Sequence, residues 1–193
     1  MSPPSKTFPP RIRLEKIPQT SPNVDARITA GPVCRTSGSS QASTSVAVIG
    51  CGGVGVAAIQ WARAVGLSVI GTAGTDKGLQ LITDQGAENS FNHNSPDYHQ
   101  QILDATQGRG VDIILEMLAN VNLGHDLRML AHRGRVVVIG SRGDVPITPR
   151  ELMIRETTIM EVLIWRTPAN EAAEIYAAID AGLKNGTLQP IVG

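Results

Sequence analysis

The stretch from residue 45 to residue 58, SVAVIGCGGVGVAA, constrains the fold more than any other part of this chain. In its G-x-G-x-x-G pattern, Gly50 permits a sharp turn out of a strand and Gly52 lets an anion approach the backbone. Gly55 then lets a helix pack close to that strand. The start of such a helix offers free N–H groups to an anion. An apolar strand before the pattern and an alanine-rich segment after it predict a dinucleotide-binding turn. A glycine-rich turn without a ligand is the alternative.

Apolar strand-like segments alternate with helix-like segments from residue 45 to the end of the chain. This alternation predicts an α/β fold of the Rossmann type, with a doubly wound six-stranded parallel sheet and helices on both faces. Within the first helix we expect a packed stripe of Ala57, Ala58, Trp61 and Ala62. The expected strands are 46–49, 67–71, 89–92, 111–116, 135–139 and 157–165, and the expected helices are 54–65, 76–85, 97–106, 123–130 and 168–184.

Residues 1–44 differ from the rest because they are rich in proline and serine and show no apolar period. We expect a disordered or loosely attached N-terminal tail, followed by a cofactor-binding domain over residues 45–193. The basic, acid-poor character of the tail also allows an organelle transit peptide, although its prolines disfavour an amphipathic helix.

Composition narrows the classes of partner. The chain has 17 basic and 17 acidic residues and a net charge of zero, which favours neither nucleic acid nor an anionic membrane. No apolar run approaches the ~18 residues of a membrane span. Two cysteines make no disulfide framework, so we expect a reducing compartment such as the cytoplasm. The four histidines have no ligand spacing, and we expect no metal site: His93, His99, His125 and His132.

The segment after the second expected strand indicates which dinucleotide would bind. NAD-binding versions of this fold place an Asp or Glu about 20 residues after the glycines, to bind the ribose diol. Ala73 stands near that position, beside the hydroxyls of Thr72 and Thr75 and the ammonium of Lys77. Because this set suits a 2′-phosphate better than a diol, we expect NADPH. The alternative is that Thr75 and Asp76 only cap the next helix.

From about residue 46 to the end, the chain resembles the coenzyme domain of the zeta-crystallin type of NADPH:quinone oxidoreductase, within the medium-chain dehydrogenase/reductase superfamily. The resemblance is carried by GTAGT (71–75), FNH (91–93), EMLANVNL (116–123), GRV (134–136), GSRG (140–143) and LQPIVG (188–193). It implies hydride transfer from NADPH to a quinone, without zinc.

The resemblance also implies roles for matched positions. Cys51, Gly52, Gly53 and Val54 would hold the pyrophosphate, Gly74 and His93 would flank the ribose phosphate, and Asn122 would reach the adenosine side. The nicotinamide side would be lined by Ile139, Gly140, Ser141, Arg142, Val162, Leu163 and Ile164.

Several of these residues have a simpler alternative role. His93 could be an ordinary loop histidine, Arg142 could merely solvate its loop, and Asn122 could be the N-cap of the helix expected from residue 123. Glu116, at the end of the fourth strand, could be a surface or capping carboxylate, and a general base is the less favoured alternative because no partner is evident. A thiol at a helix start tends to be acidic, so Cys51 could be oxidisable, although a small turn residue is the simpler interpretation.

The chain also departs from the family pattern. The turn from Gly50 to Gly55 is one residue shorter than the quinone reductases have, which puts the register of pyrophosphate binding in question. Residues 1–44 do not match the family's catalytic domain, which we expect to be absent together with its substrate cleft, and the chain stops before the family's last helix. No side chain stands out as an acid or base, so no catalytic residue is assigned.

These departures leave a second function open, a cofactor-binding module without turnover. RNA binding is a third, which the neutral charge does not support. The apolar segment 157–165 should form an edge strand that pairs across a two-fold axis, giving a homodimer or homotetramer.

Overall fold

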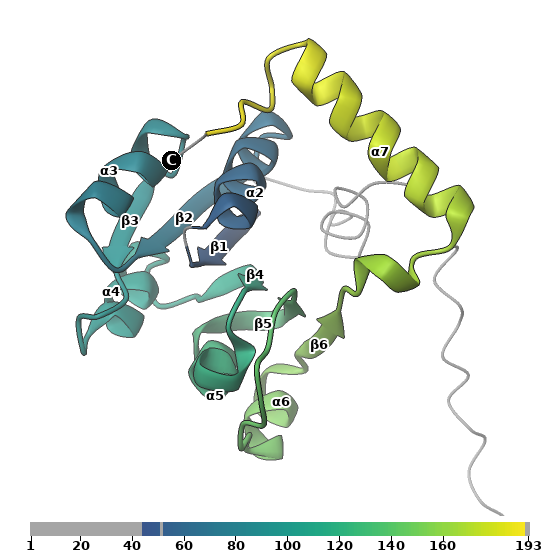
Figure 1. Ribbon diagram of the computed structural model, residues 1–193. Helices are drawn as coiled ribbons and strands as arrows, with labels where there is room; N and C mark the ends of the chain where they lie inside the picture. Colours follow the sequence, from purple (N-terminus) through teal and green to yellow (C-terminus); the bar gives the residue numbers. More distant parts are fainter. Residues whose placement is uncertain (1–43, 51, 192–193) are drawn as a thin grey trace, which may run out of the picture.

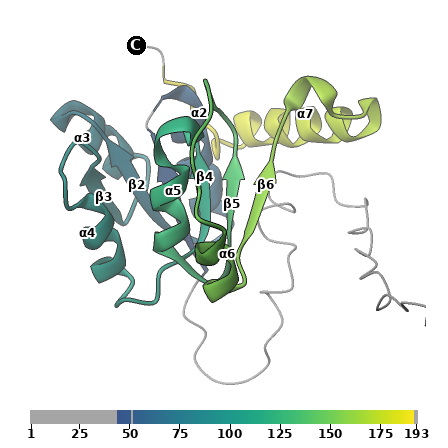
Figure 2. The same cartoon turned by 90° about the horizontal axis from the view of Figure 1, so that it is seen from below.

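Six parallel strands form the centre of the protein, and helices cover both faces of the sheet (Figures 1 and 2). The computed structural model describes residues 44–50 and 52–191. The strands lie in the order β3-β2-β1-β4-β5-β6, so β1 and β4 are the central neighbours and β6 is an edge. The predicted doubly wound Rossmann-type architecture is therefore confirmed.

Helices and strands alternate along the chain until the last helix. The elements are β1 (Ser45–Ile49), α2 (Gly53–Ala64), β2 (Ser68–Ala73), α3 (Asp76–Asp84), β3 (Asn89–Asn92), α4 (Tyr98–Ala105), β4 (Val111–Glu116), α5 (Ala119–Met129), β5 (Leu130–Val138), α6 (Pro149–Arg155), β6 (Thr158–Glu161), the 3₁₀ turn η2 (Ile164–Arg166) and α7 (Ala169–Lys184).

The core has two layers because successive side chains of a strand point to opposite faces of the sheet. Val46 and Val48 of β1 pack with α2 and α3 on one face, whereas Ala47 and Ile49 pack toward α4 and α5 on the other. In β4, Ile114 belongs to the α4/α5 layer. Glu116 lies two residues after Ile114 and therefore points to the same face of the sheet. Its carboxyl group is buried in the layer between the sheet and the helices α4 and α5.

Some predicted elements need correction. The buried residues of α2 are Gly55, Val56, Ile59, Gln60 and Ala62, while Ala57 is exposed, so the predicted stripe was offset. The helix expected from residue 123 begins at Ala119, and the strand expected over 157–165 ends at Glu161. No helix was predicted at α6, which begins with Pro149. The predicted tail, apart from Thr44, and Cys51 lie outside the described residues.

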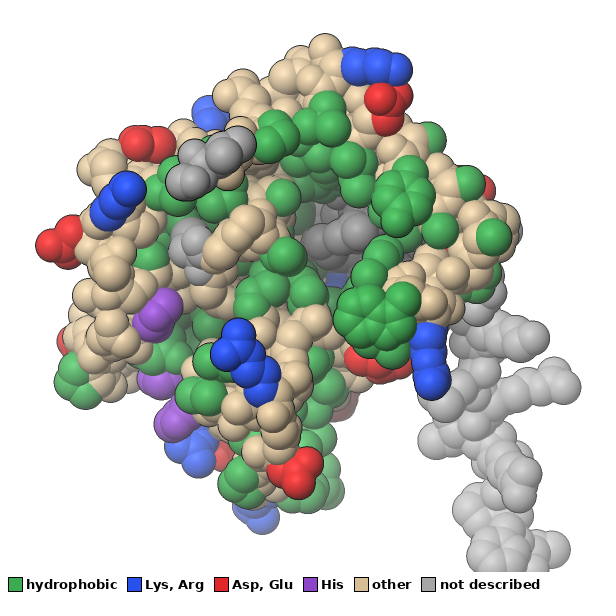
Figure 3. All heavy atoms as spheres, viewed as in Figure 1, with side chains coloured by type: hydrophobic (Ala, Val, Ile, Leu, Met, Phe, Trp, Pro, Cys, Tyr) green, Lys and Arg blue, Asp and Glu red, His purple; other side chains and the backbone are tan. Residues whose placement is uncertain are grey.

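The C-terminal helix α7 packs loosely. Its one buried residue is Gly182, where an added Cβ would lie 3.0 Å from Leu188 and from Trp61. Figure 3 shows apolar side chains gathered over α7 and the segment that follows β6. Those exposed by more than a third are Leu163, Ile164, Trp165, Tyr176, Ile179 and Leu183. Within the described residues, no helix combines the length and apolar character needed to cross a bilayer.

Candidate functional site

The carboxyl ends of the strands meet at one edge of the sheet, because all of the pairings are parallel. The chain leaves β1 toward β2 on one side, and β4 returns on the other side of β1. Ligands of open α/β sheets bind at such a switch point, outside the carboxyl ends of the strands. The predicted site residues follow the ends of β1, β2, β3, β4, β5 and β6, and the fold therefore brings them to this edge.

Two glycines fix the turn between β1 and α2. Gly50 has φ +103°, a conformation that L side chains rarely adopt. A Cβ on Gly55 would lie 2.1 Å from the carbonyl oxygen of Gly50, so no side chain fits there. Both positions therefore require glycine for the fold itself, as the motif predicted.

Gly52 and Gly53 behave differently. Gly52 is the N-cap of α2 with φ −77°, which any residue can adopt, and a Cβ on Gly52 or on Gly53 would meet nothing within 4 Å. The described protein atoms thus do not demand glycine at these positions. A turn that leaves its backbone open at a helix start fits an anionic group that approaches the main chain. Val54, in the first turn of α2, is 58% exposed.

Thr72 connects the glycine turn with His93. Its hydroxyl accepts a hydrogen bond from the N–H of Gly50 (3.2 Å) and lies 3.4 Å from Nδ1 of His93. Thr72 is fully buried, so its hydroxyl supports the turn rather than lining an open surface. Gly74 lies against the same imidazole, since a Cβ there would be 2.8 Å from Nε2 of His93. The structure therefore brings Gly74 and His93 together.

Thr75 and Lys77 begin α3. The Thr75 hydroxyl accepts the Gly78 N–H (3.1 Å), so Thr75 caps α3. Asp76 lies in the first turn, and Lys77 is exposed beside it. Lys77 is thus an exposed cation shortly after the end of β2. Ala73, which ends that strand, has no carboxylate.

The ends of β4 and β5 are tied together through the backbone. Ile139 and Gly140 donate to the carbonyl of Glu116 (2.8 and 3.2 Å), and Ala119 donates to the carbonyl of Gly140 (2.9 Å). Beyond them, Ser141 and Arg142 are exposed, and the backbone N–H of Arg142 donates to the side chain of Asn120 (2.9 Å). The loop after β5 is therefore anchored on the start of α5.

Two predictions at the end of β4 were wrong. Asn122 is the fourth residue of α5 rather than its N-cap, and its Nδ2 donates to Oε1 of Glu116 (3.2 Å). Glu116 is not a surface carboxylate, because it is fully buried. Burial raises the pKa of Glu116, and hydrogen bonds from Leu118 and Asn122 act against that rise.

Sequence reasoning missed the partner of Glu116. Asp126, in α5, is fully buried, and its pKa is raised to about 9 by burial and by the neighbouring charge of Glu116. A signal was present, because Asp126 lies on the same helical stripe as Ala119, Leu123 and Leu127. An acid on an apolar stripe indicates a buried carboxyl group.

The last predicted lining residues follow β6. Val162 is half-buried and donates its backbone N–H to Val138 (3.0 Å), whereas Leu163 and Ile164 are 42% and 44% exposed. They lie beyond the strand rather than on it, with Ile164 opening the 3₁₀ turn.

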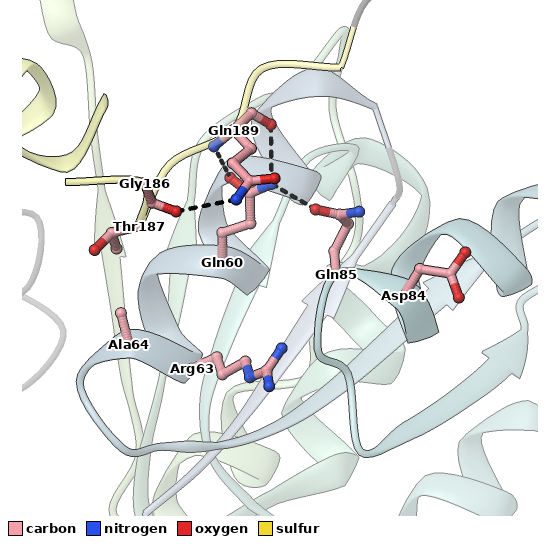
Figure 4. A pocket seen from close by; sticks show the side chains of 8 residues that line it. All are labelled: Gln60, Arg63, Ala64, Asp84, Gln85, Gly186, Thr187 and Gln189. Atoms are coloured by element: carbon pink, nitrogen blue, oxygen red, sulfur yellow. Dashed lines mark hydrogen bonds between the residues drawn. The ribbon is translucent and has the colours of Figure 1, made fainter. Parts of the chain in front are cut away.

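A separate depression of about 350 Å³ lies beside the later part of α2, away from the glycine turn (Figure 4). Its polar groups bond to one another. Nε2 of Gln60 donates to Gln85 (2.6 Å) and to the carbonyl of Gln189 (3.0 Å), and the N–H of Gln189 donates back to Gln60 (3.0 Å). These bonds hold the C-terminal segment on α2, and this depression is distinct from the predicted site.

The fold and the turn at its switch point define a dinucleotide-binding domain of the dehydrogenase class. The chain belongs to the zinc-binding dehydrogenase family, whose profile matches residues 53–181. No group of three or more His, Cys, Asp or Glu side chains that could hold a metal ion occurs in the described part of the chain. The described residues therefore supply no zinc ligand set.

Relatives and solved structures agree with this assignment. A human quinone oxidoreductase is 46% identical over 154 residues, which are 79% of this chain and 47% of that protein. The chain thus spans about half the length of the curated relatives it matches. An NAD-dependent alcohol dehydrogenase is 27% identical with a TM-score of 0.69, covering 78% of this chain and 43% of that one.

The same fold also occurs with the phosphorylated cofactor. The Escherichia coli quinone oxidoreductase complexed with NADPH is 23% identical with a TM-score of 0.69, covering 78% of this chain and 48% of that one. The fold is thus shared by proteins whose names point to different nicotinamide cofactors. The choice between these cofactors must come from side chains.

Proposed function

We propose that this chain is the NADPH-binding part of a quinone oxidoreductase. The observation that carries the proposal is the glycine turn. Gly52 and Gly53 present open backbone at the start of a helix, where the described protein atoms leave room for a side chain. The names of the relatives at 42–46% identity support the quinone as the acceptor.

NADPH rather than NADH is supported by the end of β2. Ala73 offers no carboxylate to the ribose diol, and the ammonium of Lys77 is exposed close by. A cation attracts a 2′-phosphate, whereas a carboxylate would repel it. We assign Gly74, Thr75, Lys77 and His93 to the surroundings of this phosphate. The buried Thr72 hydroxyl supports them through its contact with His93.

The remaining residues would position the other parts of the cofactor. The open turn at residues 50–55 would hold the pyrophosphate, and Asn122 would contact the adenosine side. The nicotinamide would lie against the loop after β5 (Ile139, Gly140, Ser141 and Arg142) and against Val162, Leu163 and Ile164. NADPH supplies the hydride when it is bound, and these side chains orient it toward the acceptor and exclude water. We assign no proton donor or acceptor to the reaction.

Binding measurements with the 193-residue chain test the cofactor. We expect NADPH to bind more tightly than NADH by fluorescence titration. Lys77→Ala should weaken NADPH binding roughly tenfold, since a hydrogen bond to a charged group contributes about 1.5 kcal/mol, and should leave NADH binding unchanged. Lys184→Ala is the matched control, because Lys184 lies on α7 in an exposed pair with Asp180. Equal affinity for the two cofactors would contradict the proposal.

A binding module without turnover is the second candidate. It is favoured because no side chain among the described residues is assigned as a proton donor or acceptor for the reaction. NADPH oxidation with a simple quinone, measured beside NADPH binding, separates the candidates. Oxidation above the rate without protein supports the oxidoreductase, and binding without oxidation supports the module.

A homodimer or homotetramer is proposed from the edge strand. Among the described residues, β6 pairs with β5 alone, and the exposed Leu163, Ile164 and Trp165 follow it. Sedimentation at micromolar concentration should show a dimer or larger species, and a monomer would contradict it. The low cysteine content also favours a reducing compartment such as the cytoplasm.

A further inference from the structure

Two acidic side chains lie buried together behind the carboxyl end of β4. Glu116 ends the strand, Asp126 lies on α5, and both are fully buried. Neither forms an ion pair within the described residues. Removing a lone carboxylate from water is very unfavourable, so two of them without a cation require another source of stabilisation.

The hydrogen-bond partners of the oxygens identify that source. Oε1 of Glu116 accepts from the backbone N–H of Leu118 and from Nδ2 of Asn122. Within the described residues, Oε2 of Glu116 and both oxygens of Asp126 have no hydrogen-bond partner. The two carboxyl groups lie close enough for each to act on the pKa of the other. One proton held between them would give one oxygen of each group a hydrogen-bond partner.

The surroundings decide which group carries the proton. Burial raises the pKa of both acids, and the charge of Glu116 raises that of Asp126 further, while the bonds from Leu118 and Asn122 favour the charged form of Glu116. From α4, burial and the charges of Asp126 and Glu116 raise the pKa of Tyr98, which stays neutral. Burial and the charges of His125 and Arg128 act on His99, whose pKa they lower. Asp126 is therefore the acid and Glu116 the carboxylate.

We propose that Glu116 and Asp126 share one proton and that the resulting Glu116 carboxylate positions the Asn122 side chain for the bound dinucleotide. The role of Asn122 rests on the proposed function. With Nδ2 held by an acceptor, the amide presents its Oδ1 for a further bond. The ligand group that it recognises is therefore a donor, an amino N–H or a ribose O–H. A neutral group in place of the carboxylate would let the amide turn over and present its N–H₂. Glu116 and Asp126 are thus positioning residues.

A double-mutant cycle on NADPH affinity tests the positioning. Asn122→Ala and Glu116→Ala should each raise the Kd for NADPH by roughly fivefold, the effect of one hydrogen bond between neutral groups. The double variant should bind no more weakly than Asn122→Ala alone, because Glu116 acts through Asn122. Losses that multiply would overturn the proposal. If Glu116→Ala does not fold, Glu116→Gln replaces it, and its weakening must disappear in the Asn122→Ala background.

Infrared spectroscopy tests the shared proton without any cofactor. At neutral pH the wild-type chain should show the C=O band of a buried carboxylic acid, shifted in D₂O. Asp126→Asn should remove the band, because an amide has no carboxylic acid proton. A wild-type chain without the band overturns the shared proton. A wild-type chain that shows the band but does not bind NADPH overturns the proposed function, and with it the role of Asn122.

Discussion

The two ends of β4 place acidic residues in opposite surroundings. At the start of the strand, Asp112 contacts Arg109 (2.6 Å) and accepts hydrogen bonds from the backbone N–H (2.8 Å) and hydroxyl (3.0 Å) of Ser45. At the other end, Glu116 has Asp126 as its neighbour and forms no ion pair within the described part of the chain. Burial acts to raise the pKa of Asp112, but Arg109 and Ser45 outweigh it and lower that pKa.

The difference shows that one end of β4 contributes to stability, whereas the other end lies beside the proposed binding site. The amino end joins β1 to β4 with a fully partnered charge, which fastens the centre of the sheet. The carboxyl end retains acceptor oxygens that no N–H or hydroxyl satisfies, beside the switch point where a ligand would bind. Buried acidic groups with shifted pKa values are common at functional sites, because catalysis and binding use such shifts.

The largest expected effect is the pH dependence of stability from Asp126. Its folded pKa is raised to about 9 from 3.8, so the folded chain keeps a proton that the unfolded chain releases. This contribution is full below pH 3.8 and is lost as pH rises toward 9, by about 1.4 kcal/mol per pH unit. Asp126→Asn should remove that slope in urea unfolding. Unfolding free energies that stay parallel for the two proteins between pH 5 and pH 9 would contradict this.

The next effect concerns Asp112, at the start of β4. Its contribution to the free energy of unfolding depends on pH with the opposite sign to that of Asp126. Asp112→Ala should lower the free energy of unfolding by about 2 kcal/mol at pH 7, because the buried Ser45 N–H loses a charged acceptor. Since the pKa of Asp112 is lowered, its contribution is present above 3.8 and disappears as pH falls below it. Thermal unfolding at pH 7 and pH 3 measures this. Arg109→Ala, which removes a partly exposed partner, should have a smaller effect.

The glycine turn offers a variant that affects binding without affecting stability. Gly52→Ala should leave the melting temperature unchanged, because its Cβ meets no protein atom within 4 Å. It should raise the Kd for NADPH by at least about tenfold, or ~1.4 kcal/mol, since the methyl group would occupy the space of the pyrophosphate. Gly55→Ala is the contrasting variant, because its Cβ would lie 2.1 Å from the Gly50 carbonyl and must destabilise the fold. Equal NADPH affinity of Gly52→Ala and wild type would argue against the site.

The smallest effect comes from His99. Burial, the charge of His125 and that of Arg128 lower its pKa to about 4 from 6.5, and its ring stacks 4.6 Å from that of His125. The unfolded chain therefore binds a proton that the folded chain refuses, and stability falls as pH drops from 6.5 toward 4. His99→Gln should reduce this loss by about 1 kcal/mol, because the ring is partly exposed. Urea titrations at pH 7 and pH 5 would show it, and an unchanged difference would exclude this assignment.

The strands near the switch point were predictable because their signals are local. Val111–Glu116 and Asn89–Asn92 match their predicted bounds, and the first of them is a largely apolar run. The helix α6 was missed because it is a short segment with no buried residue and little apolar period. The end of β6 was misplaced because β-branched residues continue past Glu161, where pairing with β5 stops.

The site was only partly predictable because its key contacts are not local. The glycine turn can be deduced from the sequence, since Gly50 and Gly55 answer steric needs within six residues of each other. The environment of Glu116 depends on which face of β4 packs on α5, and on Asp126 ten positions later. Thr72 resembled a surface hydroxyl in a polar turn, yet its strand continues through Ala73 and buries it.

The hydroxyl of Thr72 makes one atom common to two parts of the proposed site. It receives the Gly50 N–H from the first strand's turn and lies beside His93 from the third strand's turn. A substitution such as Thr72→Val would therefore disturb both loops at once, even though it changes neither. A natural substitution of Thr72 would therefore change the glycine turn and the loop of His93 together. Pyrophosphate binding and discrimination of the 2′-phosphate are thus expected to evolve together in this domain.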